Sequence, residues 1–252
     1  MTDHIVIERA GETGAINVIR FNRPDKKNAI TRAMYSAMAR ALIEGERDDS
    51  ARVHVMLGTP GAFTSGNDMQ DFMAVAMGGS MGTEVLDFLA SLATAKKPII
   101  SGVDGLAIGV GTTIHMHCDM TFATPDSRFH TPFTDLALVP EAGSSLLAPI
   151  AMGHQKAFAL LAAGIPFTGV DAERAGLIYK TVSADELEPA VFAAAEHLAN
   201  KPPQALAISR KLVKPDPDVV IARMREEAEH FANQLKSAEA LAAFQAFMAR
   251  KK

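Results

Sequence analysis

Apolar residues occur in short runs along the first half of the chain, and the length of these runs predicts strands. Glycines at both ends of segment 11–14 predict a hairpin turn between the first two runs. The predicted strands lie at residues 5–9, 15–20, 53–58, 98–103 and 120–124.

Longer amphipathic segments alternate with these strands and predict helices at 32–46, 69–77 and 83–93. Thr31 precedes the first of them and is a suitable N-cap residue. The alternation of strand and helix indicates an α/β fold with a largely parallel sheet. From residue 190 onward the chain is rich in alanine and predicts helices, so we expect an α/β core at 1–195 and a C-terminal helical segment at 196–252.

The composition is that of an ordinary globular protein, with 252 residues, 48% of them hydrophobic and 21% charged. The formal net charge of −4 gives no electrostatic support for binding nucleic acid or an anionic membrane. The longest strongly apolar run, 157–165, is too short to span a bilayer. Cys118 is the only cysteine, so no intrachain disulfide is possible. We therefore expect a cytoplasmic protein without membrane association.

Two loops rich in glycine, 62–68 and 105–111, share one construction: each follows a short apolar strand and precedes a helix. Free backbone N–H groups at such a place favour an anion or a developing oxyanion. The loops lack the residues of a P-loop and the spacing of a dinucleotide fingerprint. From spacing alone, the glycines could equally serve only to allow tight turns.

The residues of these loops resemble the crotonase, or enoyl-CoA hydratase/isomerase, family. Residues 63–69 (FTSGNDM) are similar to its first oxyanion segment, and residues 103–111 (VDGLAIGVG) to its second. The similarity continues in family order over nearly the whole chain. It includes residues 22–24, 28–29, 129–133, 140–143 and 167–177.

This resemblance implies a crotonase-like spiral of β-β-α turns with a C-terminal helical segment, assembled as a homotrimer or a dimer of trimers. It implies an acyl-CoA thioester as substrate and no separate cofactor, because coenzyme A is part of the substrate. The backbone N–H groups of Ser65 and Val110 would form the oxyanion hole, where one donor contributes roughly 3–4 kcal/mol to transition-state stabilisation. The resemblance also implies residues near coenzyme A: Lys26, Lys27, Ala29, Asp68, Met69 and Lys251.

The carboxylates expected of a hydratase are absent. The family's hydratases use two glutamates around one water, and this chain has Thr113 and Phe133 at those positions. Glu141 remains at a third catalytic position, which in the Δ3,Δ2-enoyl-CoA isomerase branch holds the base. The resemblance therefore implies an isomerase in which Glu141 moves a proton from C2 to C4.

Three residues near Glu141 would form an apolar acyl pocket, namely Phe133, Leu136 and Leu138. Asp135 is a possible second acid or base, and would restore limited hydratase chemistry. From sequence alone, Glu141 could instead be a solvent-facing loop carboxylate.

Three other interpretations remain open at this point. His115, His117 and Cys118 suggest a metal site, but their spacing places the two histidines on different helix faces, so we expect no metal. The protein could catalyse hydration or another acyl-CoA reaction. It could also be a non-catalytic module that binds CoA or a protein.

Overall fold

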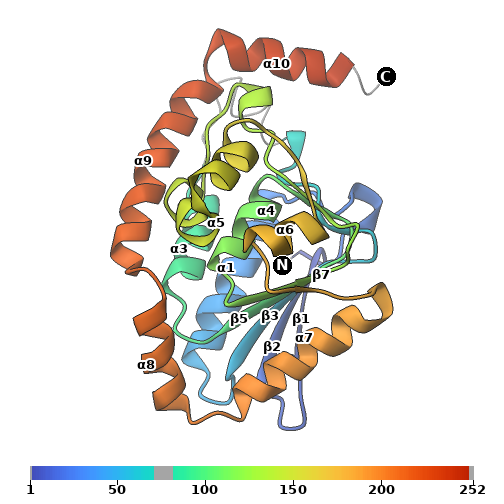
Figure 1. Cartoon of the computed structure of the whole chain (residues 1–252), viewed down its shortest axis with the longest axis vertical. Coiled ribbons are helices and arrows are strands. Elements are labelled where there is room, and N and C mark those ends of the chain that lie inside the picture. The colour runs from blue at the N-terminus through green and yellow to red at the C-terminus, as the bar shows by residue number, and fades with distance from the viewer. Residues whose placement is uncertain (1, 71–81, 250–252) are drawn as a thin grey trace.

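The computed structural model describes residues 2–70 and 82–249, and its centre is a six-stranded sheet (Figure 1). β1 and β2 are antiparallel, as the predicted hairpin requires, and the other neighbouring strands are parallel. The strand order is β1 (Ile5–Ala10), β2 (Ile16–Phe21), β3 (Val53–Leu57), β5 (Ile99–Val103), β7 (Met120–Ala123) and β10 (Lys180–Thr181).

A second sheet consists of strands of two or three residues. Its order is β4 (Ala62–Thr64), β6 (Leu106–Ile108), β8 (Arg128–His130) and β9 (Phe167–Thr168). β4, β6 and β8 are parallel, and β9 is antiparallel to β8. The prediction that 62–68 and 105–111 are loops throughout is therefore wrong, because each segment contains a short strand, β4 in the first and β6 in the second. Three residues are too few to show the alternation by which a strand is recognised.

The helices are α1 (Arg32–Arg47), α3 (Glu84–Thr94), α4 (Val110–Thr113), α5 (Ser144–Leu161), α6 (Gly169–Ala175), α7 (Ala184–Ala199), α8 (Pro203–Val213), α9 (Pro217–Leu235) and α10 (Ala238–Ala249). Short 3-10 helices are η1 (Pro24–Lys26), η2 (Ile114–His117) and η3 (Thr134–Leu136). The Thr31 side chain accepts a hydrogen bond from Met34 N, as predicted for an N-cap. Most of the expected helix at 69–77 lies outside the described residues.

Three successive pairs of strands, β3/β4, β5/β6 and β7/β8, place their first member in the large sheet and their second in the small one. A helix follows each pair in the described chain: α3, α4 and α5. This repeat is the expected spiral of β-β-α turns. Because β4, β6 and β8 are parallel, their carboxyl ends lie at the same edge of the small sheet.

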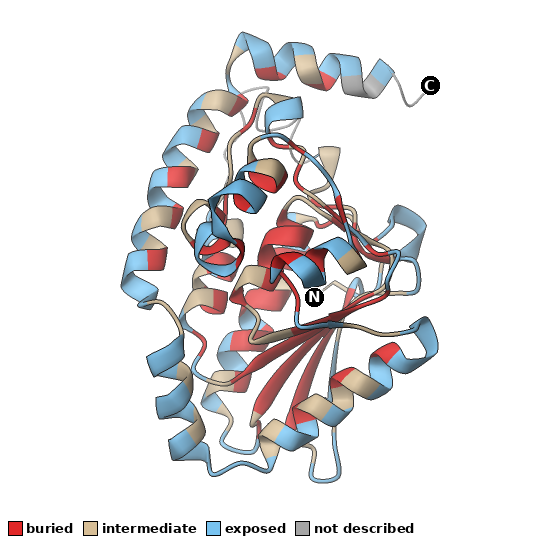
Figure 2. Cartoon of the chain, in the orientation of Figure 1, coloured by how far each residue is buried: buried red, intermediate tan, exposed pale blue. Residues whose placement is uncertain are grey.

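Helices cover both faces of the large sheet, so its central strands are buried on both sides (Figure 2). In β3, Val53, Val55 and Leu57 pack with α7 residues in one apolar cluster. Met56 points to the opposite face, into the main core with α1 and α3. This alternation follows from the two-residue period of a strand.

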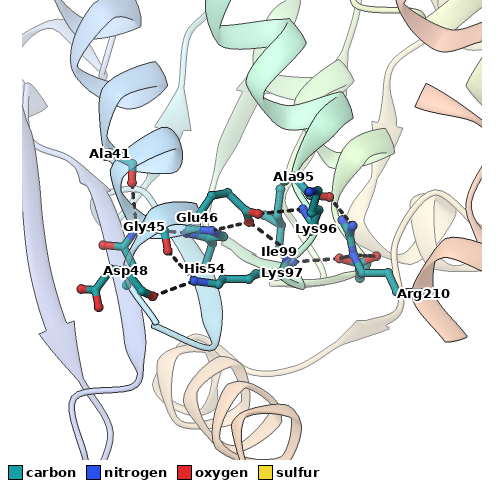
Figure 3. Close-up of polar contacts among 12 residues, drawn as sticks. Ala41, Gly45, Glu46, Asp48, His54, Ala95, Lys96, Lys97, Ile99 and Arg210 are labelled. Carbon is teal, nitrogen blue, oxygen red and sulfur yellow. Dashed lines mark hydrogen bonds and ion pairs between the residues drawn. The ribbon is translucent and has the colours of Figure 1, made fainter. Parts of the chain in front are cut away.

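A polar network ties α1 to β3 and to the segment before β5 (Figure 3). The Glu46 carboxylate lies 3.1 Å from His54 Nε2 and accepts hydrogen bonds from the backbone N–H groups of Lys96 and Lys97. Burial alone would raise the pKa of Glu46, but these hydrogen bonds lower it to about 2. Arg210 of α8 extends the network by donating to Asp119 and to the Ala95 carbonyl.

The last helices run along the outside of the core. α9 packs against α3 and α5, and α10 crosses the top of the molecule in Figure 1, against η3. α7 spans residue 195, where we expected the helical segment to begin, and packs on the large sheet. None of the described helices is both long and apolar enough to cross a bilayer.

Candidate active site

The two glycine loops lie against each other at the edge where β4 and β6 end. A Cβ atom at Gly111 would lie 2.4 Å from Thr64 Cγ2, so only glycine lets α4 approach the end of β4 this closely. A Cβ atom at Gly66 would lie 3.0 Å from the Ile108 carbonyl oxygen. These contacts bring the segments that carry Ser65 and Val110 together.

Val110 is the first residue of α4, so its N–H has no partner within the helix. Gly109 precedes it with φ of +57°, a conformation that favours glycine, and Gly109 N donates to the His130 carbonyl at 2.8 Å. Among the described residues, no hydrogen bond from the Val110 N–H is found. This group fits the expected role of an oxyanion donor.

Unlike the Val110 N–H, the Ser65 N–H has a hydrogen-bond acceptor within the chain: it donates to the Lys27 carbonyl oxygen at 2.9 Å. The contact belongs to a series in which Ile30 N donates to the Gly66 carbonyl and Asp68 N to the Ile30 carbonyl. The first glycine loop is therefore hydrogen-bonded along the segment after η1. For the Ser65 N–H to act as the expected oxyanion donor, the ligand oxygen would have to share it with the Lys27 carbonyl or displace that carbonyl.

Glu141 is buried, with a relative exposure of 9%, and is not a solvent-facing loop carboxylate. Thr113 Oγ1, at the end of α4, donates to Glu141 Oε1 at 3.0 Å. Burial raises the pKa of Glu141 to about 7; the Thr113 hydrogen bond opposes this rise, and the charge of Glu227 adds to it. At neutral pH the group can both accept and release a proton.

The three residues expected to line an acyl pocket belong to the apolar core near Glu141. Phe133 and Leu138 are buried, and Leu136 is half-buried and packs against the same cluster. Asp135 is exposed on η3, beside Gly164. The carboxylate whose charge acts on Glu141 is Glu227, not Asp135.

Two neighbouring segments carry the described residues expected near coenzyme A, and backbone hydrogen bonds join the segment of Lys26, Lys27 and Ala29 to the first glycine loop. Lys26 and Lys27 are exposed, and the Ala29 carbonyl accepts a hydrogen bond from Arg23 at 2.9 Å. Arg23 also forms an ion pair with Asp68, with 2.6 Å between nitrogen and oxygen.

The Asp68 ion pair is partly buried. Burial alone would raise the pKa of Asp68, but the Arg23 hydrogen bond and nearby positive charges lower it overall. Met69 is half-buried against the core, and Lys251 lies outside the described residues.

The histidines that suggested a metal site are buried behind α4. Burial lowers the pKa of His115 to about 3 and that of His117 to about 4, so both are neutral at pH 7. In the parts of the chain that the structure describes, no group of three or more His, Cys, Asp or Glu side chains is arranged to hold a metal ion.

Comparison with known proteins identifies the family. The profile described as enoyl-CoA hydratase/isomerase matches residues 11–252. The chain belongs to this family. A Pseudomonas aeruginosa protein described as OdaA has 38% sequence identity and a TM-score of 0.92, over 98% of this chain and 99% of its own. The crotonase-like α/β fold is thereby confirmed.

Family relatives carry both isomerase and hydratase names. A rat protein named enoyl-CoA delta isomerase 2 is 33% identical over 94% of this chain and 62% of its own length. A Rhizobium meliloti protein named probable enoyl-CoA hydratase is 27% identical over 95% of this chain and 93% of its own. The chain thus spans less than two thirds of the rat isomerase, and the family alone does not decide the reaction.

Two residues of this candidate site have no role that the sequence predicts. Thr113 was noticed only because a hydratase glutamate is missing there, yet its hydroxyl contacts Glu141. A hydroxyl at a position where relatives have a proton-transfer group is a signal that could have found it. Glu227 lies 86 residues after Glu141 in an ordinary helical sequence, where nothing distinguishes it from surface glutamates.

Proposed function

We propose that the protein is a Δ3,Δ2-enoyl-CoA isomerase. The observation that carries the proposal is the buried Glu141, whose pKa is raised to about 7 and whose carboxyl group is hydrogen-bonded to the helix that begins with Val110. One base that accepts and returns one proton is sufficient for this reaction. The names of the rat, human and mouse relatives, all enoyl-CoA delta isomerases, agree with it.

In the proposed reaction, Glu141 removes a proton from C2 of a 3-enoyl-CoA. The electron pair of that C–H bond moves toward the thioester oxygen and forms a dienolate. Glu141 then returns the proton to C4, which leaves the double bond between C2 and C3, conjugated with the thioester. The reaction consumes no water and needs no metal or redox step.

The dienolate oxygen would be stabilised by the N–H groups of Val110 and Ser65. Val110 supports this role directly, because its N–H points out of the first turn of α4 without a partner among the described residues. The Ser65 N–H would turn from the Lys27 carbonyl to the substrate oxygen, or be shared between them. The short distance between the two glycine loops supports their joint use.

The environment of Glu141 favours isomerisation over hydration. Phe133 and Thr113 occupy the positions of the hydratase glutamates, and neither side chain is a general base at neutral pH. Asp135 is exposed and does not contribute to the charge around Glu141. Phe133, Leu136 and Leu138 would instead line the acyl chain and exclude water.

Binding of coenzyme A belongs to the same proposal. Lys26 and Lys27 are exposed beside the first glycine loop, where their positive charge would suit the CoA phosphates. Ala29, Asp68 and Met69 would shape this side of the site, with Asp68 acting through Arg23. Lys251 would reach the nucleotide from the C-terminus of the same or a neighbouring subunit.

A homotrimer, or a dimer of trimers, and a cytoplasmic location complete the proposal. Large apolar side chains on α8 and at the start of α9 are exposed in the single chain, including Leu212, Val213 and Val219. Such a surface is suited to contact with another subunit.

The proposal is tested with 3-enoyl-CoA and 2-enoyl-CoA as alternative substrates of the purified protein. We expect isomerisation of the 3-enoyl thioester by the wild type, its loss in Glu141→Gln, and its retention in the matched carboxylate variant Asp135→Asn. Faster hydration of the 2-enoyl thioester, retained in Glu141→Gln and lost in Asp135→Asn, would refute the isomerase and favour a hydratase.

A further inference from the structure

The turn between Glu141 and α5 has an unusual backbone. Ala142 has φ of +62° and Gly143 has φ of +71°, so two successive residues adopt the left-handed conformation. At a residue with a Cβ atom this conformation costs about 1–3 kcal/mol and persists only where surrounding contacts fix it. The orientation of Glu141 therefore depends on groups outside the turn.

Glu227 of α9 supplies the most extensive of these contacts. Its carboxylate accepts hydrogen bonds from Gly143 N at 2.6 Å, Ser145 N at 2.9 Å and Ser145 Oγ at 2.6 Å. The side chain is buried, with a relative exposure of 5%. A negative charge at this place is also favoured by the N-terminus of α5, whose first segment runs as far as the kink at Gly153. The backbone N–H groups of Gly143 and Ser145 thus find their acceptor in Glu227, which is distant in the sequence, and not in a neighbouring residue.

His117 fixes the turn from the other side. Its Nε2 lies 2.7 Å from the Ala142 carbonyl oxygen, which requires the ring proton on Nε2. Because burial lowers the pKa of His117 to about 4, this neutral form persists at pH 7. The turn that carries Glu141 is therefore held between η2 and α9.

The contact with α9 is both apolar and polar: Val220 and Met224 pack against the turn, and a Cβ atom at Gly143 would lie 3.0 Å from Val220 Cγ1. A cavity of about 190 Å³ lies between the Val139–Pro140 segment and α9, where Arg223, Glu227 and His230 line it. Packing with Val220 and Met224 holds α9 against the turn, and the cavity leaves the polar side of this contact to the carboxylate of Glu227. The hydrogen bonds of Glu227 are the directional part of this connection, because they fix the positions of individual backbone N–H groups.

We propose that Glu227 is a positioning residue, which from α9 fixes the turn that carries Glu141 and whose charge acts on that carboxyl group. The inference rests on the proposed role of Glu141 as the base. It assigns to the C-terminal helical segment an indirect part in the reaction, through a residue that does not touch the substrate.

Electrostatics give this arrangement a second consequence. The charge of Glu227 raises the pKa of Glu141, since two negative charges in a buried region repel each other. Removing the Glu227 charge therefore favours the ionised form of Glu141 and lowers its pKa. The other titratable groups around the turn are Arg223, Glu226 and His230 of α9, His117 of η2 and Lys214, which follows α8.

The test compares Glu227→Gln with Glu226→Gln. Glu226 is the neighbouring carboxylate, is mostly exposed and pairs with Arg223. Its variant removes the same charge but none of the hydrogen bonds to the turn, because the contact there is made by Arg223, which donates to Ser145 Oγ at 3.1 Å. Two quantities are measured in each protein: the pKa of Glu141 by ¹³C NMR of the labelled carboxyl, assigned with Glu141→Gln, and the pH dependence of isomerisation. In Glu227→Gln we expect a lower pKa of Glu141 and an acidic limb of kcat/KM at lower pH. We also expect kcat to fall roughly 10–100-fold with little change in KM, because the base is misplaced.

Glu226→Gln should behave as the wild type in both measurements. The proposal is overturned if the pKa of Glu141 is unchanged in Glu227→Gln, or if Glu226→Gln lowers it equally. If the wild type shows no isomerisation, the proposed function fails, and the NMR titration alone then decides the role of Glu227. If Glu227→Gln does not fold, Ser145→Ala replaces it, since it removes one of the three hydrogen bonds. A smaller loss of kcat at constant KM then supports the proposal, and an unchanged kcat contradicts it.

Discussion

Thr113→Val gives the sharpest test of how the site sets the proton affinity of Glu141. The substitution keeps the shape of the side chain but removes the hydroxyl that donates to Glu141 Oε1 at 3.0 Å. This hydrogen bond stabilises the ionised carboxylate, and without it the pKa of Glu141 rises further above its value of about 7.

The magnitude follows from the energy of a hydrogen bond to a charged group, about 1.5–3 kcal/mol. At 1.36 kcal/mol per pKa unit, the loss corresponds to a rise of roughly 1–2 units. Glu141 is about half ionised at pH 7 in the wild type, and the ionised fraction would fall to roughly 10% or 1%. We therefore expect kcat/KM for the 3-enoyl thioester to fall about 5–50-fold at pH 7 and to recover at high pH.

The assay is a profile of kcat/KM against pH, because this ratio reports on groups of the free enzyme. Thr113→Ser, which retains the hydroxyl, is the matched control and should keep the wild-type profile. An acidic limb that stays in place in Thr113→Val would refute the reasoning. A loss of equal size at every pH would likewise show that Thr113 acts on something other than proton affinity.

Three further predictions concern stability and binding. Because the pKa of Glu141 is higher in the folded state, about 7, than in the unfolded state, 4.5, its protonation stabilises the folded state below pH 4.5. This contribution is lost as pH rises through about 7. As pH rises from 4.5 to 7, the free energy of urea unfolding should therefore fall by about 3 kcal/mol more in the wild type than in Glu141→Gln. A difference between the two proteins that stays constant with pH would contradict the burial argument. Gly111→Ala places a Cβ atom 2.4 Å from Thr64 Cγ2 and should lower the free energy of unfolding by about 1–3 kcal/mol in the same assay. It should also lower kcat, because the two loops are pushed apart, and an unaffected kcat would mean that the loops need not be this close. Arg23→Met leaves Asp68 without its partner and should raise KM several-fold at unchanged kcat, which a normal KM in steady-state assays would disprove.

The large sheet was predictable because its strands obey simple rules. Strand β3 is buried on both faces, so its sequence is a continuous apolar run, and the β1–β2 hairpin has glycines at its turn. The small sheet was not predictable from pattern, since β4, β6 and β8 have three residues each. Their pairing depends on contacts between successive turns of the spiral, which no local pattern records.

The candidate site also combines features that the sequence predicts with features that only the fold shows. The proposed backbone donors could be suggested from the glycine loops and the family resemblance, because the loops that carry them are continuous in sequence. The pairing of Ser65 N with the Lys27 carbonyl could not, since the two residues are 38 positions apart and join through backbone atoms. The resemblance to the family supplied Glu141, whereas its burial and its partners come only from the fold.

Glu141 is subject to two opposing influences from different parts of the chain. Thr113, from the helix that begins with Val110, lowers its pKa, and Glu227, from the C-terminal helical segment, raises it. With burial, the result is a pKa of about 7, where a group can take a proton from C2 and give it back to C4 with similar ease. Thr113→Val and Glu227→Gln should therefore move the acidic limb of kcat/KM in opposite directions. Shifts of the same sign would show that both variants act through a common loss of structure, and that the balance inferred at Glu141 does not exist.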